Sequence, residues 1–463
     1  MRFFIKDTQL LKTYDTVKTS FWFIPCLILL LTMSCCVILL CIDLYSECHT
    51  ISWLHFLYHA DASITRDLLT SIAGSIMTVV SITFSITIVA LTTASSQFGP
   101  RLIRNFMDDT STQLVLGTFI SLFVYCLVLV RMTDQFANGN FLPGLTIAGA
   151  MLMTLCGILL LIYFIHHVSQ NLQSDNVIDN VHLELQRTLE KIFDQQREDE
   201  NTENGQNQPT TQRTKTGEQK EIINQADAIL LKSDKCGYIQ TINYACLCKI
   251  MKELDGYLEV VIKQGDFVVK RMITMKCYVP YLSKEDEQAL HNCFTFGAKR
   301  TPIQDPEFAI HQLVEIALRA LSPGINDPYS AIACVDKLTA TLCDMTHKTF
   351  PKGYACDEDN LERVHYKVTS FHNLASIAFD QIRQYSQTCL AISLRQLEGL
   401  IHIAEQANHS SHWFFIDHQK HMIEHSLKQR PLIDLDKKEV THRLQHLDRL
   451  LTTQREQQEK QEA

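Results

Sequence analysis

Between Asp67 and Arg101 the chain runs for more than thirty residues without one charged side chain. A helix crosses a bilayer with about 20 mostly apolar residues, so this stretch predicts a transmembrane helix. It is nevertheless rich in hydroxyl groups, which a helix surrounded only by lipid does not require. We therefore expect this helix to face other helices or water. From Ser71 onward, the hydroxyl-bearing residues are Ser71, Ser75, Thr78, Ser81, Thr83, Ser85, Thr87, Thr92, Thr93, Ser95 and Ser96.

Three further apolar runs predict that the N-terminal third of the chain is a membrane domain. Hydrophobic residues make up 46% of the 463 residues, which averages an apolar N-terminal third with a polar remainder. The first run is too long for a secretory signal and lacks a small-residue cleavage site before Asp43, so we expect it to remain as a span. The predicted spans cover residues 21–42, 72–93, 113–130 and 145–168 of a membrane domain over 21–168.

Basic residues near the spans predict that both termini lie in the cytoplasm. Cytoplasmic loops carry the excess of Lys and Arg, and here basic residues gather in the N-terminal tail, residues 1–20, and between the second and third spans. The other loops hold little beyond Arg66 and Arg131. An even number of spans then places the large C-terminal part in the cytoplasm. The basic residues on this side are Arg2, Lys6, Lys12, Lys18, Arg101 and Arg104.

Charge and cysteine content argue against several classes of protein. The net charge is -9 and no Lys/Arg block is interleaved with aromatic residues, so we expect no nucleic-acid partner. Of the 16 cysteines, only Cys48 clearly falls in a predicted extracytoplasmic loop, which implies no disulfide framework. Cys246 and Cys248 are one residue apart and no Cys-x-x-Cys pair occurs, so the spacing of a structural zinc site is absent. We expect no cofactor.

The C-terminal part divides into five predicted segments. Apolar residues at helical spacing continue the fourth span as a stalk over 169–194. Residues 195–221 contain almost no apolar side chains and predict a disordered linker. A small β-rich α/β module over 222–280 precedes a helical domain over 281–430, and residues 431–463 predict an amphipathic C-terminal helix. The predicted fold class is mostly α, with a four-helix transmembrane region and an α-dominated cytoplasmic domain that contains the small β-rich module.

Alternation and turn residues locate the elements of the β-rich module. Residues 237–242 and 257–262 alternate like strands, and residues 244–254 have the pattern of a helix. Gly265 lies in a turn that leads into a short strand at Phe267. Three later helix starts carry capping residues: Ser283 with Asp286, Asp305 with Pro306, and Asp327 with Pro328.

Several separated strings stand in a fixed order over about residues 15 to 400. In the membrane domain they are Val89-Ala90-Leu91, residues 94–101, Asn105-Phe106 and residues 113–119. In the soluble part they are Gly237-Tyr238-Ile239-Gln240, Gly265-Asp266-Phe267-Val268, Arg300-Thr301 with Gln304-Asp305-Pro306, and residues 319–328. As a set, these strings resemble the bacterial predicted membrane proteins of the domain of unknown function 2254 family.

The resemblance implies a bacterial inner-membrane protein with an N-terminal multi-span region and a cytoplasmic domain. It implies no particular reaction or ligand. The chain departs from the family pattern after the Gly-Asp-Phe-Val string, where family members usually have a glycine and this chain has Lys270 and Arg271. The polar linker around Gly205 looks like an insertion.

Six of the hydroxyl residues fall within one stripe of the second span, at about 100° per residue, interrupted by Ile82 and Val89. Hydroxyls that face a water-filled path can bind ions or solutes in transit, and a four-span subunit would have to oligomerise to surround such a path. The alternative is packing, because Ser and Thr often bond to their own helix and small side chains let helices approach closely. The candidate pore-lining residues are Ser71, Ser75, Thr78, Ser85, Thr92 and Ser96.

The end of the second span is a candidate gate. Gly99 and Pro100 break the helix, and Arg101 and Arg104 follow it. These cations could contact lipid headgroups or the soluble domain and so move with a gating elbow. An ordinary span end with positive-inside anchors explains the same residues.

Polar residues near two predicted helix starts form a candidate ligand site. A helix terminus with an adjacent arginine can hold an anion, so these side chains could converge on an ion or a small ligand. The alternative is structural, since the prolines, glycine and Asn-Asp pair of residues 322–328 specify a tight turn before a capped helix. The ligand-binding candidates are Arg300, Gln304, Arg319, Asn326 and Asp327.

A histidine cluster late in the chain has the spacing of metal ligands on one helix face. His418, His421, Glu424 and His425 are separated by three, three and one positions. Further histidines nearby indicate a generally histidine-rich surface instead, and we predict no metal site.

No catalytic motif is present, so we expect a protein that is not an enzyme. The chain lacks a Gly-x-Ser-x-Gly elbow, a Gly-rich phosphate loop and a His-Glu-x-x-His motif. Two classes remain: an oligomeric channel or transport protein that uses the second span, and a membrane-anchored cytoplasmic sensor or scaffold that binds a ligand or a protein partner. The expected partners are the lipid bilayer, further copies of the chain and a small ion or solute, and the expected location is a bacterial inner (plasma) membrane.

Overall fold

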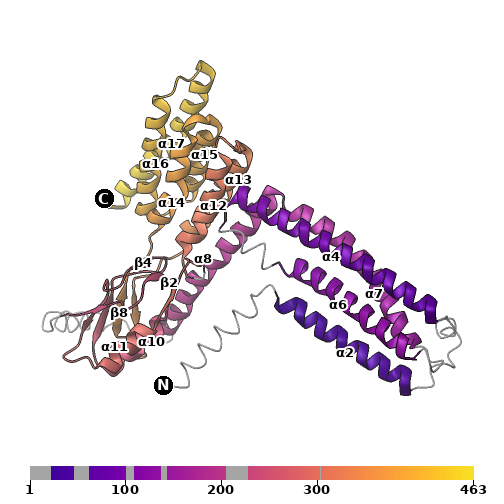
Figure 1. Ribbon diagram of the computed structural model, residues 1–463. Helices are drawn as coiled ribbons and strands as arrows, with labels where there is room; N and C mark the ends of the chain where they lie inside the picture. Colours follow the sequence, from indigo (N-terminus) through magenta and orange to yellow (C-terminus); the bar gives the residue numbers. More distant parts are fainter. Residues whose placement is uncertain are drawn as a thin grey trace. The chain divides into compact units, whose positions relative to one another are not determined.

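The computed structural model describes residues 22–45, 62–100, 109–136, 143–204, 228–302 and 304–462. The chain divides into two compact units, Met1–Asn176 and Val177–Ala463. The first unit holds the apolar helices, and the second holds the strands and the remaining helices (Figure 1). This arrangement confirms the predicted fold class.

Within the part of the first unit that the structure describes, four helices are long and apolar enough to cross a membrane. The predicted number of spans is therefore confirmed. The second helix has 37 residues, so at 1.5 Å per residue it is about 55 Å long, well beyond the roughly 30 Å of a bilayer's hydrocarbon core. The helices are α2 (Phe23–Tyr45), α4 (Ala62–Phe98), α6 (Thr110–Phe136) and α7 (Gly144–Asn171).

Helix α6 is the most buried of the four within this unit. A β-carbon on Gly117 would lie 2.8 Å from the Cα atom of Pro25, so glycine allows α2 and α6 to approach this closely. The phenol of Tyr125 donates a hydrogen bond of 2.9 Å to the carbonyl of Thr146 in α7. The core around α6 contains the buried residues Cys36, Leu69, Val115, Phe119, Leu122, Tyr125, Leu129 and Phe164.

The carboxylate of Asp43 joins the end of α2 to the start of α7. Its Oδ1 accepts a hydrogen bond of 3.1 Å from the amide of Leu145, and its Oδ2 accepts from the amide and the hydroxyl of Thr146, at 2.9 and 2.6 Å. Asp43 is only 1% exposed. It caps first-turn amides of α7 that have no partner inside the helix.

A second carboxylate, Asp109, binds the opposite end of α7. It precedes α6 and accepts hydrogen bonds from the amide and the hydroxyl of Thr112, at 3.3 and 2.6 Å. The same carboxylate lies 3.5 Å from Nδ1 of His167 near the end of α7. One turn earlier, the phenol of Tyr163 hydrogen-bonds the hydroxyl of Ser111 at 3.2 Å. Helix α7 is therefore held by polar contacts at both of its ends.

Helix α8 (Ser174–Asn204) begins three residues after α7 ends, so the predicted continuous stalk is a separate helix. It also extends into the segment predicted as a disordered linker, and the linker boundary is wrong for residues 195–204. Gln and Glu make up half of this stretch and are good helix formers, although they give no apolar face. Residues 205–221 of the predicted linker lie outside the described residues.

In the described residues of the second unit, eight strands form two sheets. The five-stranded sheet has the order β1-β5-β3-β8-β7, and the three-stranded sheet has the order β4-β2-β6. All neighbouring strands are antiparallel except β3 and β8. The strands are β1 (Ile229–Lys232), β2 (Gly237–Ile242), β3 (Tyr257–Val260), β4 (Phe267–Val268), β5 (Ile273–Tyr278), β6 (Phe294–Gly297), β7 (Tyr354–Cys356) and β8 (Glu362–Tyr366).

The β-rich module is therefore larger than the predicted range of 222–280. Strands β6, β7 and β8 come from later in the chain, and β8 pairs with β3 about a hundred residues before it, through partners such as Leu258 and Val364. Its buried core joins both sheets with α10 (Tyr244–Glu253) and α11 (Lys284–Asn292). Local alternation identified β2 and β3 but not β1 or β5, and it carried no information about which later strands join them.

The remaining helices of the second unit are drawn above its strands in Figure 1. The amides of Asp286, Phe308 and Ser330 bond the side chains of Ser283, Asp305 and Asp327 at 3.1, 3.0 and 3.2 Å, which confirms the three predicted caps. The helices are α12 (Pro306–Ala320), α13 (Pro328–Thr346), α14 (Phe371–Tyr385), the 3₁₀ turn η3 (Ser386–Thr388), α15 (Leu390–Gln406), α16 (Ser410–Lys428) and α17 (Asp434–Glu462).

The predicted amphipathic C-terminal helix is α17, and its apolar side is covered within the chain. Val440, Leu447 and Leu451 are buried, and α17 packs against α15 and α16. Lys420 of α16 forms an ion pair with Asp448. This helix therefore contributes to the fold of the second unit.

Candidate functional site

The six predicted pore-lining hydroxyls lie on the outer face of α4. All six residues are exposed within the described part of the first unit. A β-carbon on nearby Gly74 would meet no atom within 4 Å, so this part of the helix surface is open. Thr83, which is off the stripe, is buried instead. The hydroxyl stripe is thus turned away from the other described helices of the first unit.

Most of these hydroxyls donate their hydrogen to their own helix. Ser75 and Ser85 bond the carbonyls four residues earlier at 2.8 and 2.9 Å, and Thr78 does so at 3.2 Å. Thr92 and Ser96 bond carbonyls three residues earlier, at 2.9 and 2.8 Å. A hydroxyl has one hydrogen and two lone pairs, so these groups can offer only acceptors to anything outside the helix.

The predicted gate begins with a true helix end. Helix α4 stops at Phe98, and Gly99 takes a φ of +113°, which an L-residue rarely adopts. Pro100 then prevents the helix from continuing. Arg101 and Arg104, the other two gate candidates, lie outside the described residues.

Three of the recognised strings lie side by side at the start of α12. The amide of Ile239 donates to the carbonyl of Asp266 at 3.0 Å, and the amide of Gly265 donates back to the carbonyl of Ile239 at 2.9 Å. A β-carbon on Gly265 would lie 2.2 Å from a carboxylate oxygen of Asp305 and 2.7 Å from Nη2 of Arg300. Glycine is needed there because the loop touches this pair directly.

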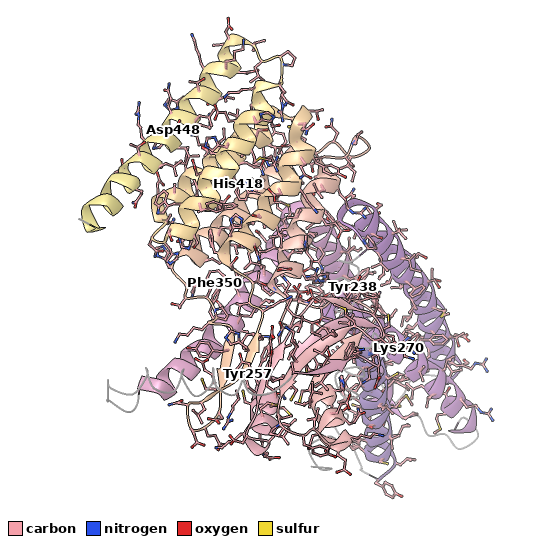
Figure 2. All side chains as sticks on the ribbon, turned by 90° about the vertical axis from the view of Figure 1, so that its left-hand side faces the viewer. Tyr238, Tyr257, Lys270, Phe350, His418 and Asp448 are labelled. Carbon is pink, nitrogen blue, oxygen red and sulfur yellow. The ribbon has the colours of Figure 1, made fainter. Side chains whose placement is uncertain are left out.

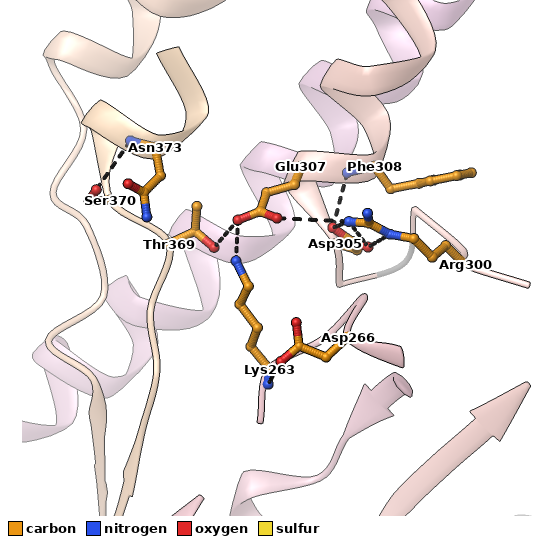
Figure 3. Close-up of polar contacts among 9 residues, drawn as sticks. All are labelled: Lys263, Asp266, Arg300, Asp305, Glu307, Phe308, Thr369, Ser370 and Asn373. Carbon is orange, nitrogen blue, oxygen red and sulfur yellow. Dashed lines mark hydrogen bonds and ion pairs between the residues drawn. The ribbon is translucent and has the colours of Figure 1, made fainter. Parts of the chain in front are cut away.

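Arg300 and Asp305 form a bidentate ion pair. Nε and Nη2 of Arg300 donate hydrogen bonds of 2.7 and 2.8 Å to the two carboxylate oxygens of Asp305 (Figure 3). Asp305 is 2% exposed and also caps α12 through the amide of Phe308. Burial raises the pKa of Asp305 above its ordinary value, while the Arg300 guanidinium and the Phe308 amide oppose that shift.

A second ion pair continues this network. Glu307 in the first turn of α12 pairs with Lys263 and accepts a hydrogen bond of 3.1 Å from the hydroxyl of Thr369 (Figure 3). The amide of Lys263 donates to the carboxylate of Asp266 at 2.9 Å. The network thus connects the β3–β4 loop, the start of α12 and the segment before α14.

A cavity of about 720 Å³ opens beside this network, entirely within the second unit. Strands β2, β7 and β8, the middle of α8 and the starts of α10 and α12 all contribute to its lining. Phe350, labelled in Figure 2, lies in its wall and packs edge-to-face on Phe193 of α8, with ring centroids 5.4 Å apart. The lining combines apolar and aromatic side chains with three lysines, two carboxylates and several side-chain amides.

Two glutamines organise one wall of the cavity. Oε1 of Gln304 accepts a hydrogen bond of 3.0 Å from the amide of Ile242. Nε2 of Gln264 lies 3.1 Å from the phenol of Tyr244 and 3.4 Å from Oε1 of Gln304. Tyr244 stacks on Tyr366, with ring centroids 4.0 Å apart. Burial raises the pKa of the Tyr244 phenol, which is neutral at physiological pH.

The five predicted ligand-binding residues do not form one site. Arg300 and Gln304 precede α12, whereas Arg319, Asn326 and Asp327 lie at its other end, about 20 Å away at 1.5 Å per residue. There Arg319 pairs with Glu315 at 3.5 Å, and Asp327 caps α13. Asn326 has a φ of +50°. The structural interpretation fits the second group, while the first group belongs to the network beside the cavity.

The order of the strings and the fold agree with a comparison of the whole chain with known protein families. A family model described as a predicted membrane protein, DUF2254, matches residues 18–402. The chain belongs to the DUF2254 family. Uncharacterised proteins of Mycobacterium bovis and Mycobacterium tuberculosis are each 28% identical to this DUF2254 protein over 328 residues, which are 69% of this chain and 60% of the relative. The chain thus spans less than two thirds of these relatives, and no solved structure matches it.

The late histidine cluster of this DUF2254 protein shows no ligand arrangement. Nε2 of His421 lies 3.5 Å from Asp417, and Nε2 of His425 bonds Gln429 at 3.0 Å. His418 stacks on Phe414, with ring centroids 6.4 Å apart. Among the residues that the structure describes, no group of three or more His, Cys, Asp or Glu side chains is placed to hold a metal ion.

Sequence reasoning missed the lysines and tyrosines of the cavity and one pair of thiols. Lys263 lies about a hundred residues before the adjacent residues Tyr366 and Lys367, and no local pattern links the two segments. Cys246 in the first turn of α10 hydrogen-bonds the thiol of Cys293, which follows α11, and this contact lowers the pKa of Cys246. The only available signal was a cysteine near a helix start, where thiolates are stabilised.

Proposed function

We propose that this DUF2254 protein is a homo-oligomeric channel or transport protein of a bacterial inner membrane, in which α4 of each subunit faces a shared path. The observation that carries the proposal is the outward position of the six hydroxyls on α4. Four spans are too few to enclose a path, so several copies must assemble around it. Assembly on this face would give the exposed hydroxyls water or a neighbouring subunit as a partner.

The transported species we propose is a small cation. Because the hydroxyl hydrogens are used within α4, oxygen lone pairs face outward from the helix. Oxygen acceptors can replace the hydration water of a cation. An anion would require donors, and the uncharged stretch of α4 supplies no cationic side chain.

The proposal also includes the orientation of the protein in the membrane and the absence of a catalysed reaction. Both termini lie in the cytoplasm, an arrangement supported by the basic N-terminal tail and by the even number of spans. The protein acts without catalysis, which is supported by the lack of catalytic motifs in the sequence.

Cation flux through the purified protein in liposomes tests this function. Thr78→Leu and Ser85→Leu should abolish flux at matched protein incorporation, because leucine replaces an acceptor with an apolar side chain in the middle of the stripe. Thr118→Leu on α6 is the matched control, since Thr118 also bonds its own helix, at 2.8 Å, but lies off this face. No cation flux above empty liposomes, or equal loss in all three variants, would overturn the proposal.

The cavity favours a second candidate, a membrane-anchored sensor that binds a ligand in the cytoplasm. The residues Leu189, Ile192 and Phe193 of α8 line the cavity, and α8 begins three residues after the last span. A ligand there would contact the helix that follows the membrane domain directly in the chain. Ligand binding without any flux would favour this candidate over the channel.

A further inference from the structure

The cavity of the second unit has the size of a small-metabolite site. Its volume of about 720 Å³ falls within the roughly 300–1,000 Å³ typical of such sites. Segments far apart in the sequence line it, from Leu189 in α8 to Leu374 in α14. The folded unit therefore creates a pocket with mixed chemistry that no single element provides.

The charges of the lining favour an anion. Two carboxylates reach the cavity, but each is held by an arginine: Asp305 by Arg300, and Asp357 by Arg363, whose Nε donates at 2.9 Å. Burial alone would raise the pKa of Asp357, yet the hydrogen bonds from Arg363 and two backbone amides hold it below its ordinary value. These negative charges are thus already compensated before a ligand arrives.

Three lysines supply positive charge to the same cavity. Lys263 shares its charge with Glu307, whereas Lys352 and Lys367 have exposed side chains at the lining. Lys367 forms no ion pair with any residue that the structure describes. An anionic ligand could therefore approach the ammonium group of Lys367 without displacing a buried ion pair.

One helix start also favours an anion. Asn243, Tyr244 and Ala245 at the start of α10 line the cavity, whereas the start of α12 is already capped by the carboxylate of Asp305. First-turn amides lack partners inside their own helix and carry partial positive charge. Lysines together with such amides match a phosphate group, which offers several charged oxygens.

Aromatic and amide groups supply the rest of a binding site. The stacked rings of Tyr244 and Tyr366 both contribute to the lining. A planar ring can stack on such side chains. The amides of Gln264, Gln304 and Asn243 can bond the polar edge of that ring or a sugar hydroxyl.

We propose that this cavity binds a mononucleotide, with its phosphate on the lysines and its base on the tyrosine pair. The size, the compensated carboxylates, the lysines and the aromatic pair together select a ligand that carries both a phosphate and a planar ring. This proposal does not depend on conduction by α4, so the binding experiment tests it independently of the proposed channel.

Isothermal titration of the full-length protein in detergent tests the proposal. The probes are AMP, GMP, CMP and UMP, with adenosine and inorganic phosphate as separate arms. At least one mononucleotide should bind with one site per subunit, and the nucleoside and the phosphate should each bind at least about tenfold more weakly, because each makes only part of the contacts. If none of the four mononucleotides binds at millimolar concentration, the proposal is wrong.

Two variants locate the site. Lys367→Glu should weaken binding more than about tenfold by placing a negative charge against the phosphate, and Tyr366→Leu should weaken it about tenfold. Lys270→Glu is the matched control, since Lys270 is an exposed lysine of the same unit outside the cavity lining (Figure 2). Binding that survives Lys367→Glu, or that is lost equally in Lys270→Glu, would overturn the assignment. Unchanged melting temperatures establish that the variants fold.

Discussion

Replacing Gly265 by alanine should destabilise the start of α12 by about 3 kcal/mol. Gly265 has a φ of +87°, a backbone conformation that costs an L-residue about 1–2 kcal/mol. The added methyl would lie 2.2 Å from a carboxylate oxygen of Asp305, so that side chain must move away from Arg300. A hydrogen bond to a charged group contributes about 1.5–3 kcal/mol and an N-cap about 1 kcal/mol, while the smaller entropy of the unfolded alanine chain returns less than about 1 kcal/mol.

Hydrogen exchange of the full-length protein, read by mass spectrometry on the peptide over residues 305–312, measures this change locally. A loss of about 3 kcal/mol makes exchange roughly a hundredfold faster, at 1.4 kcal/mol per factor of ten. Gly324→Ala is the matched control, because a β-carbon there would meet nothing within 4 Å and its φ is not positive. Exchange within threefold of the unchanged protein for Gly265→Ala, or equal acceleration in Gly324→Ala, would refute the reasoning.

Three further predictions concern single residues of the second unit. Arg271 has a φ of +68°, so Arg271→Gly should raise the stability to urea by up to about 1 kcal/mol, whereas Lys270→Gly should lower it; a loss of stability for Arg271→Gly would contradict this. His412 is 5% exposed, and burial lowers its pKa to about 4, below about 6.5 in the unfolded chain. The unfolded state then binds the extra proton, so stability should fall by about 2 kcal/mol between pH 7 and pH 5, and urea titrations of His412→Leu should show a smaller fall if His412 is the cause. Iodoacetamide at neutral pH should modify Cys246 before buried Cys248. The variant Cys293→Ala should react more slowly at Cys246, because it removes the hydrogen bond that lowers the pKa of that thiol. Mass spectrometry of the peptides measures the labelling, and faster labelling of Cys246 in Cys293→Ala would exclude this cause.

Signals confined to a few neighbouring residues predicted the structure well. The strand over 237–242 has the predicted bounds, and the caps at Ser283, Asp305 and Asp327 form as expected. A cap requires only a side chain and an amide three residues later, so the sequence contains all of the information. The four apolar helices follow in the same way from length and composition alone.

Contacts between distant segments were not predictable in this way. Asp43 and Thr146 are 103 residues apart, and nothing near either residue indicates the other. Periodicity placed six hydroxyls on one face of α4, but the direction of that face depends on how the other three helices pack. For the same reason, the sequence placed Arg300 and Arg319 in one candidate site, whereas in the structure they lie at opposite ends of α12.

The buried carboxylate of Asp43 has a consequence for the order in which the membrane domain assembles. The ribosome makes α2 about a hundred residues before the amides of Leu145 and Thr146 exist. During that interval the first span is already in or near the bilayer, where a carboxyl group at a helix end remains at the interface with water because hydrocarbon excludes polar groups. Insertion of the fourth span supplies the two amides and the hydroxyl that bond Asp43 where it is buried. The last span therefore completes the surroundings of a residue in the first, and a chain truncated before α7 lacks these three donors.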